Sequence, residues 1–324
     1  MREILYRDAI CEALDEEMER DGNVLLLGED VGFLGGNFKT SVGLFEKYGD
    51  LRVKDTPISE AGFVGMGTGM ALTGLRPVIE LMFSDFLLVA ADQIINNAAK
   101  IRYMSGGQVT VPMVIRTPIG GGRSSAAQHS QSMQAMVAQF PGMKVVVPSN
   151  AQEAKGLLKT AIRDDNPVIF FEHKMEYSNK YMIDDVVEPI PFGKARIARE
   201  GRDVTIVATS SMVMKSEKAA EELEKQGISC EVIDLRTIVP LDREAIVESV
   251  KKTGRLLVVD EAHVRCGIGA EIGADVMDDV FYYLDAPVGR IGTPNVPLPF
   301  SPALEFPVIP STEKIIAKVN QMMK

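Results

Sequence analysis

Residues 144–172 read KVVVPSNAQEAKGLLKTAIRDDNPVIFFE. Two short runs rich in β-branched and aromatic residues, 144–148 and 167–172, flank a segment at 151–163 whose apolar residues recur at helical spacing. A strand, a helix and a second strand in this order are typical of parallel pairing, because parallel strands need a crossover that is usually a helix. The stretch therefore predicts an α/β fold in which helices cover both faces of a parallel sheet.

The same alternation continues on the N-terminal side of this stretch. Runs that read as strands lie at 23–28, 77–81 and 111–117, and a segment with helical periodicity spans 83–104. On the C-terminal side, residues 173–195 lose both periodicities and gather charges and prolines, which is typical of a linker between domains.

Beyond residue 195 the alternation resumes. Four further runs read as strands: DVTIVAT (203–209), CEVIDL (230–235), RLLVVDE (255–261) and APVGRIG (286–292). The helices between them are expected at 214–226, 242–253 and 268–284. The last part of the chain, 293–310, is rich in proline and is expected to lie extended over a surface.

These patterns indicate two domains. We expect the first at 1–180, a linker at 181–200 and the second at 201–324. Each domain should contain a largely parallel sheet flanked by helices.

The bulk composition excludes several classes of protein. The 324 residues carry a formal net charge of -10, whereas nucleic acid and anionic membranes require a basic surface on their partner. No apolar run is long enough for a membrane span, and the first residues lack the apolar block of a signal peptide. The three cysteines form no CxxC pair, which is typical of a reducing compartment. We therefore expect a cytoplasmic protein with neither nucleic-acid nor membrane partners.

Residues 55–74, DTPISEAGFVGMGTGMALTG, place Glu60 directly ahead of a run of glycines. The run lacks both the Lys-Ser or Lys-Thr of a phosphate-binding P-loop and the spacing of the dinucleotide fingerprint. We expect a helix here on which Gly62, Gly65 and Gly69 share one face, so that another helix or backbone can approach closely. Glu60 is then either a first-turn acid favoured by the helix dipole or a group that binds a partner other than an anion.

His129 lies in AAQHSQS (126–132), after the strand at 111–117 and the loop PIGGGRSS (118–125). In open α/β sheets, ligands bind in loops beyond the carboxyl ends of the strands. His129 is therefore a candidate for contact with a substrate, and the alternative is a histidine on a surface loop.

The stretch AIRDDNPVIF (161–170) ends a helix and enters a strand. The last carbonyl groups of a helix have no partner within it, and Asp164 and Asn166 add side-chain oxygens beside them. Such a cluster of oxygen atoms suits a hard cation, and the alternative is an ordinary polar turn.

Several stretches, in order along the chain, carry a family resemblance: TPISEAGFVGMGTGMALTGLRPVIELMFSDF (56–86), IRYMSGG (101–107), AAQHSQS (126–132), PGMKVVVPS (141–149), KGLLKTAIRDDNPVIFFEHK (155–174), VIDLRTIVPLD (232–242) and SPALE (301–305). Together they resemble the β subunit of the thiamine-diphosphate-dependent E1 component of 2-oxo acid dehydrogenase complexes. The resemblance covers nearly the whole chain. It implies a pyrimidine-binding domain followed by a transketolase-type C-terminal domain.

The resemblance assigns roles to four residues. It implies that Glu60, the acid of the TPxSE motif, hydrogen-bonds N1′ of the aminopyrimidine ring of thiamine diphosphate, a cofactor that acts as an electron sink. Burial would raise the pKa of such a carboxyl and let it exchange a proton near neutral pH. Phe86 matches the aromatic residue that stacks on the ring, and Ile58 matches an apolar contact. His129 matches the histidine that faces the substrate and the incoming lipoyl group, where it can exchange a proton.

The resemblance also implies a site for a monovalent cation, with potassium as the ion. The matching positions are Met113, Ala161, Ile162, Asp164 and Asn166. Main-chain oxygens supply part of this site, so those positions require no particular side chain.

The chain lacks the family motif that binds diphosphate and magnesium. That motif begins with GDG and ends with an asparagine, whereas this chain has only GDL at 49–51 and no such asparagine after it. The resemblance therefore implies that an α subunit holds the magnesium ion, in an α2β2 assembly with cofactor at each α–β interface. The C-terminal domain would provide dimer contacts and dock the lipoyl-bearing E2 acyltransferase.

The substrate remains open at this stage. Relatives act on pyruvate, acetoin or branched-chain 2-oxo acids, and LMFSDF (81–86) and FFEHK (170–174) favour the pyruvate or acetoin type. A branched-chain 2-oxo acid dehydrogenase β subunit is the alternative. An alternative from another class is a non-catalytic nucleotide-binding α/β protein, in which Glu60 would oppose the phosphate.

Overall fold

The quoted stretch folds as a strand, a helix and a strand. In the computed structural model, which describes residues 1–324, these elements are β6 (Lys144–Val146), α6 (Ala151–Arg163) and β7 (Val168–His173). Strands β6 and β7 pair in parallel. Asn150 caps α6, because its side chain accepts a hydrogen bond from the Glu153 N–H at 3.0 Å. The expected strand–helix–strand unit is confirmed.

The chain divides into two units. The first comprises residues 1–119 and 136–192, and the second comprises residues 120–135 and 193–324. The short segment 120–135 therefore leaves the first unit after a strand, and the chain returns to that unit within helix α5 (Gln134–Ala138). The domain limits expected from the sequence assign all of residues 1–180 to one domain and do not include this segment in the second, and they stay a prediction.

The first unit contains a parallel sheet whose strands follow the order β6-β7-β5-β4-β2-β3. Its remaining strands are β2 (Val24–Gly28), β3 (Val53–Asp55), β4 (Arg76–Glu80) and β5 (Val114–Ile119). A separate antiparallel pair is formed by β1 (Arg2–Leu5) and β8 (Lys180–Ile183). The helices of this unit are α1 (Tyr6–Arg20), α2 (Leu44–Tyr48), α3 (Glu60–Leu72), the 3-10 helix η1 (Ser84–Leu88), the π-helix η2 (Asp92–Ala98), α4 (Ile101–Met104) and the 3-10 helix η3 (Glu176–Ser178).

The second unit contains a sheet in the order β14-β13-β10-β11-β9, in which only β9 runs antiparallel to its neighbour. Its strands are β9 (Arg196–Arg199), β10 (Val204–Ala208), β11 (Cys230–Asp234), β12 (Thr237–Val239), β13 (Leu256–His263) and β14 (Gly289–Thr293). Its helices are α7 (Met212–Glu224), α8 (Arg243–Thr253), α9 (Ile268–Asp275), α10 (Met277–Val280), the 3-10 helix η4 (Phe281–Tyr283), α11 (Pro302–Val308) and α12 (Thr312–Met322). None of the helices in either unit is long and apolar enough to cross a bilayer.

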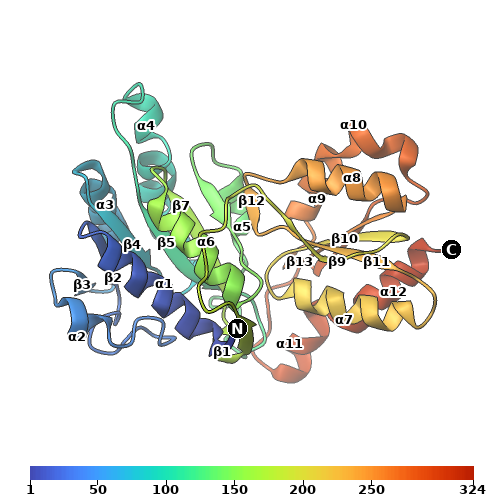
Figure 1. Cartoon of the computed structure of the whole chain (residues 1–324), viewed down its shortest axis with the longest axis horizontal. Helices are drawn as coiled ribbons and strands as arrows, with labels where there is room; N and C mark the ends of the chain where they lie inside the picture. The colour runs from blue at the N-terminus through green and yellow to red at the C-terminus, as the bar shows by residue number, and fades with distance from the viewer. The chain divides into compact units, whose positions relative to one another are not determined.

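Helices cover both faces of the second sheet (Figure 1). Ile206 of β10 packs in a core with residues of α7 and α12, whereas its neighbour Val207 packs in a core with residues of α8 and α9. Successive residues of a strand point to opposite faces, so two layers of helix are needed to bury them. In the first unit, α1 and α6 lie side by side and share one core with the sheet. The expectation of two largely parallel sheets flanked by helices is confirmed.

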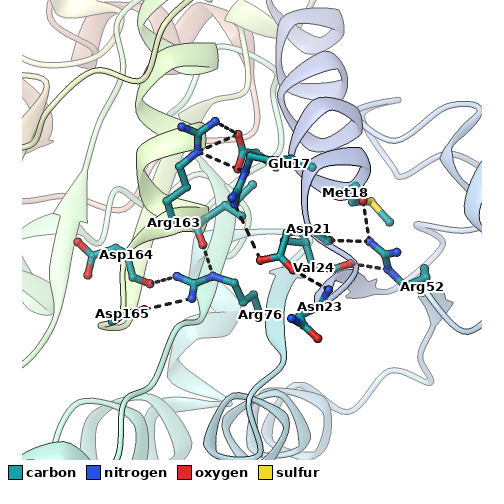
Figure 2. Close-up of polar contacts among 12 residues, drawn as sticks. Glu17, Met18, Asp21, Asn23, Val24, Arg52, Arg76, Arg163, Asp164 and Asp165 are labelled. Carbon is teal, nitrogen blue, oxygen red and sulfur yellow. Dashed lines mark hydrogen bonds and ion pairs between the residues drawn. The ribbon is translucent and has the colours of Figure 1, made fainter.

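Three arginines lie at the amino-terminal edge of the first sheet, where α1 and α6 end (Figure 2). The guanidinium group of Arg52 donates to the carbonyl oxygen of Met18 at 3.0 Å, and that of Arg76 donates to the carbonyl oxygen of Ile162 at 2.8 Å. Arg163, the last residue of α6, pairs with a buried carboxylate of α1. The contacts of Arg52 and Arg76 satisfy helix carbonyl groups that have no partner within their own helix.

The expected helix at 83–104 is interrupted. Its middle turn is a π-helix, in which the Ala99 N–H donates to the carbonyl oxygen of Ile94, five residues earlier, at 3.0 Å. The Asn97 side chain donates to the carbonyl oxygen of Asp92 at 3.2 Å. Side-chain amides that compete for backbone carbonyls in this way disturb a regular helix, and apolar periodicity does not reveal them.

Two other regions differ from the expectation. Residues 293–310 are not extended throughout, because they include helix α11 with Pro302 in its first turn, where the missing N–H has no cost. The expected linker at 173–195 includes β8, which pairs with the first strand of the chain. That pairing joins distant residues, so local periodicity does not predict it.

Candidate active site

Three neighbouring strands of the first unit, β3, β2 and β4, end at one edge of the sheet because both pairs are parallel. Ile58 and Glu60 follow β3, Glu29 follows β2, and Phe86 follows β4. Loops beyond the carboxyl ends of parallel strands form the usual binding crevice of such sheets. The fold therefore brings three of the predicted site residues to the same edge.

Glu60 is the first residue of α3, and only 6% of its surface is exposed. The preceding Ser59 makes no side-chain cap, so the first N–H groups of the helix lack that partner. A carboxylate at this position is favoured by the unpaired N–H groups and by the helix dipole. The expectation that a helix opens at this acid is confirmed, and its catalytic role stays a prediction.

Glu29 is a second buried acid at the same edge, and the sequence analysis did not single it out. It is 8% exposed, and its Oε1 atom has no hydrogen-bond partner. Burial raises the pKa of Glu29 above its ordinary value, and the carboxyl groups of Glu60 and Asp30 raise it further. Acids whose pKa values are perturbed by burial and by a neighbouring charge are typical of functional sites.

Phe86 and Ile58 differ in solvent exposure. Phe86 is half-buried and packs edge to face on Phe83, with ring centroids 5.9 Å apart and planes at 90°. A ring held in this way can still stack on a planar ligand. Ile58 is 83% exposed, so its side chain is open to contact from outside the chain.

A buried ion-pair network lies behind this edge. Arg116 of β5 pairs with Glu80 of β4 at 2.9 Å and with Glu172 of β7 at 2.7 Å, and Thr40 donates to Glu80 at 2.8 Å. Burial opposes the charge on Arg116, but the ion pairs with Glu172 and Glu80 outweigh it and hold the pKa of the guanidinium above its ordinary value. The network fixes the end of β4, from which the chain runs to Phe86.

Only some of the glycines of α3 lie close to other parts of this chain. A Cβ atom on Gly67 would lie 2.4 Å from Cδ1 of Ile79, so this glycine allows α3 to approach β4 closely. A Cβ atom on Gly65 would meet Oε1 of Gln93 at 3.0 Å, whereas one on Gly69 would meet no atom within 4 Å. The face expected to receive another helix is therefore largely open in this chain. The closest approach occurs at Gly67, which the sequence analysis did not assign to that face.

His129 belongs to the second unit, because segment 120–135 does. The histidine is half-buried, and its neighbour Ser130 is 2% exposed. A cavity of about 380 Å³ lies against the segment, lined by Ser130 and Gln131 on one side and by Glu261 and His263 of β13 on the other. His129 itself does not line this cavity but lies next to Ser130, which does, and its contact with a substrate stays a prediction.

The five residues predicted to bind a cation lie at the amino-terminal edge of the first sheet, opposite to Glu60: Met113, Ala161, Ile162, Asp164 and Asn166. Arg76 donates to the carbonyl oxygens of Ile162 and Asp164 at 2.8 and 2.7 Å (Figure 2). Burial opposes ionisation of the Asp164 carboxyl, but hydrogen bonds from Lys144 and Asn166 outweigh it and hold its pKa below the ordinary value. A bound potassium ion would share oxygens that already accept from these cationic side chains, so the cation site stays a prediction.

Comparison with known proteins identifies the family. Residues 2–180 match the transketolase pyrimidine-binding domain, and residues 193–315 match the transketolase C-terminal domain. The pyruvate dehydrogenase E1 component subunit beta of Rickettsia bellii is 49% identical over 320 residues, which cover 99% of this chain and 98% of that one. The 2-oxoisovalerate dehydrogenase subunit beta of Bacillus subtilis is 46% identical over 321 residues, which cover 98% of each chain. The chain belongs to the family of 2-oxo acid dehydrogenase E1 β subunits.

A solved structure extends the comparison to the fold. The split gene transketolase, described as an inactive beta4 tetramer, superposes with a TM-score of 0.80 and 26% sequence identity over 99% of this chain and 98% of that one. The resemblance inferred from the sequence motifs of this E1 β chain is therefore confirmed.

The structure gathers the predicted site residues of this E1 β chain in three places. Ile58, Glu60 and Phe86 lie at the carboxyl edge of the first sheet, and His129 lies in the second unit. The predicted cation ligands lie at the amino-terminal edge of the first sheet. Glu29 was missed, although its position directly after a buried strand could have drawn attention to it.

Proposed function

We propose that this chain is the β subunit of a pyruvate-type E1 component, which decarboxylates a 2-oxo acid and transfers the acyl group to a lipoyl group of E2. The observation that carries the proposal is the sequence identity to pyruvate dehydrogenase β subunits of distant organisms, in which nearly half of the residues along the whole chain are identical. The mitochondrial subunit beta-1 of Arabidopsis thaliana is 49% identical over 319 residues, which cover 97% of this chain and 88% of that one. The Bacillus subtilis 2-oxoisovalerate relative makes a branched-chain substrate the second candidate.

The groups at the carboxyl edge of the first unit fit the aminopyrimidine half of thiamine diphosphate. Glu60 offers a buried carboxyl group for a ring nitrogen, Phe86 a half-buried aromatic ring for stacking, and Ile58 an apolar surface. The unpaired Oε1 atom of buried Glu29 is a second indication that this edge takes a polar ligand. When bound, the cofactor would supply the electron sink that decarboxylation requires.

Glu60 would hold or release one proton at the ring nitrogen N1′. It lies buried at the start of α3, at the edge where the ring is expected to bind. Glu29 lies buried at the same edge with one carboxyl oxygen unpaired, and burial and the carboxyl group of Glu60 raise its pKa.

His129 would act on the substrate side of the site. A histidine can donate and accept a proton near neutral pH, which suits protonation of the thiolate that is released when the lipoyl disulfide accepts the acyl group and opens. Its place beside a polar cavity of the second unit supports this role.

The assembly proposed here follows from the missing motif. A partner α subunit would supply the GDG motif, hold Mg²⁺ and bind the diphosphate, in an α2β2 complex located in the cytoplasm and docked on E2. The chain alone would then be inactive, and the split gene transketolase that is similar to it is described as an inactive beta4 tetramer. Acetyl transfer would be the specific reaction, with acetoin as a further substrate to test.

The nucleotide-binding alternative is opposed by the buried acid Glu60 in residues 55–74, the stretch that it would use, and it has no support at the glycine-rich loop 118–125 either. The N–H groups of Gly121 and Gly122 donate to carboxylates of the same chain. A nucleotide phosphate would therefore compete with fixed negative charges.

Glu60→Gln in the complex with the α subunit tests the proposal. Glutamine keeps the size of the side chain but cannot transfer a proton, so exchange of the C2 hydrogen of bound thiamine diphosphate for deuterium should slow by about 10²–10⁴-fold. The matched control is Glu244→Gln, which alters an exposed acid in the first turn of α8 and should leave exchange unchanged. Near-normal exchange in Glu60→Gln would mean that this acid only stabilises the start of a helix.

The substrate requires a second measurement. The kcat/KM values of the assembled enzyme for pyruvate, acetoin and 2-oxoisovalerate should be largest for pyruvate. A larger value for 2-oxoisovalerate would replace the pyruvate assignment by the branched-chain one.

A further inference from the structure

The loop that follows β5 is held by two carboxylates of the second unit. The N–H groups of Gly122 and Ser124 donate to the two carboxylate oxygens of Glu305 at 2.8 and 2.9 Å. The N–H group of Gly121 donates to Glu261 at 2.6 Å. Glu305 lies on α11 and is fully buried, so these N–H groups are essential partners for its charge.

The backbone of this loop has the shape of an anion-binding nest. Gly120 and Gly122 both have a φ of +93°, and Ser124 and Ala126 have φ values of +53° and +61°. Left-handed residues that alternate with ordinary ones turn successive N–H groups toward one side, which creates a concave site for an anion. For serine and alanine such a φ is unfavourable, so the conformation needs an external contact to hold it. Glu305 provides that contact.

Helix α11 also packs directly on the loop. A Cβ atom on Gly121 would lie 2.7 Å from Cδ1 of Ile309 and 3.3 Å from Oε1 of Glu305. There is no room for a larger side chain or for an added ligand between loop and helix. The nest is therefore occupied by a residue of the chain itself.

The other end of the segment is held by a third carboxylate. Nε2 of Gln134 donates to Oδ1 of Asp260 at 2.9 Å, and Ser130 between the two ends is buried. His129 therefore lies on a short stretch whose two ends are both bound to the second unit. We therefore expect a change at either end to move this stretch.

We propose that Glu305 is a positioning residue for His129, acting through the nest formed by the N–H groups of Gly122 and Ser124. The inference rests on the proposed role of His129 in acyl transfer. It gives a function to the SPALE stretch, which lies far along the chain from the histidine.

Glu305→Gln tests this inference in the complex with the α subunit. Glutamine has nearly the same shape, but one oxygen becomes an amide that donates, so it cannot accept from both N–H groups. Transfer of the acyl group to a free lipoyl domain should fall by about 10²-fold, the order of loss expected when a catalytic group is displaced. Deuterium exchange at C2 of the bound cofactor should stay close to that of the parent. The control Glu313→Gln changes an exposed acid on α12 and should match the parent in both assays.

A double-mutant cycle separates positioning from a general structural role. In a His129→Ala background, Glu305→Gln should cause no further loss of acyl transfer, because the residue through which it acts is already missing. Equal losses in both backgrounds would overturn the inference. If His129→Ala alone leaves transfer unchanged, the proposed role of the histidine fails, and the inference fails with it.

Hydrogen exchange of the parent protein gives a test that does not depend on whether the variant folds. The backbone amides of Gly122 and Ser124 should exchange slowly, because both donate to a buried carboxylate. Exchange at the rate of an unstructured peptide would show that the nest does not hold the loop.

Discussion

Replacing Asp260 by asparagine should remove a defined part of the pH dependence of stability in the second unit. Oδ1 of Asp260 accepts hydrogen bonds from Thr209 and Gln134, both at 2.9 Å, whereas Oδ2 has no partner. Burial raises the pKa of Asp260 to about 6, although the hydrogen bonds from Thr209 and Gln134 act in the opposite direction. Asparagine has a similar shape and still accepts at its carbonyl oxygen, but it does not titrate.

The sign and size of the effect follow from proton linkage. The ordinary pKa of the side chain is 3.8, so the native state binds the proton more tightly than the unfolded state does. The stability from this proton is fully present below pH 3.8 and is lost as the pH rises through about 6. The complete effect is about 3 kcal/mol, and about 1 kcal/mol of it falls between pH 8 and pH 5, because one pH unit below the native pKa corresponds to a factor of about ten.

Urea unfolding of the parent chain and of Asp260→Asn at pH 5, 6, 7 and 8 measures this difference. The amide group of the variant adds a cost that does not change with pH, so the quantity to measure is how the free energy of unfolding of the parent minus that of the variant changes with pH. This difference should fall by about 1 kcal/mol from pH 5 to pH 8. Differences that stay constant over this range would show that Asp260 is ionised throughout, and the argument from burial would be wrong.

Four other substitutions test the first unit. Arg116→Met should destabilise it by about 3–5 kcal/mol, because Glu172 would stay buried without its cation, and unchanged urea unfolding would contradict this. Gly67→Ala should lower the free energy of unfolding by about 1–3 kcal/mol, because the added methyl group would press against β4. Gly69→Ala should raise the free energy of unfolding of the isolated chain by up to about 1 kcal/mol, because alanine favours a helix more than glycine does. Thermal melts with and without the α subunit would show whether the stability gained by Gly69→Ala is lost on assembly, as expected if the partner packs against this glycine. Asp164→Ala should lower the melting temperature more in potassium than in sodium buffer, because only in potassium would the parent gain stability from a bound ion. A parent whose melting temperature does not depend on the cation would show that these residues form only a polar turn.

The parts of the fold that could be predicted depend on neighbours in the sequence. Helix α6 has its cap at Asn150, an apolar face within its own length and strands directly on both sides. The edge at which Glu60 and Phe86 meet follows from the same alternation, since parallel strands place their carboxyl ends together.

The parts that could not be predicted depend on residues far apart. Segment 120–135 belongs to the second unit, and its N–H groups bind Glu261 and Glu305, which lie 140 and 183 residues further along the chain from their donors. Neither acid has a local pattern that points to the glycines. Glu29 directly follows a predicted strand, but its burial beside Glu60, which marks it as unusual, depends on the pairing of β2 with β3 and β4.

Because segment 120–135 belongs to the second unit, it also determines how the chain can be divided into fragments for separate expression. A fragment that ends at residue 180 would contain the nest without Glu261 and Glu305, and a fragment that begins at 193 would contain those acids without the nest. Each piece would expose charges or N–H groups that the intact chain satisfies internally. Separate expression of the second unit would therefore require that residues 120–135 be supplied together with residues 193–324.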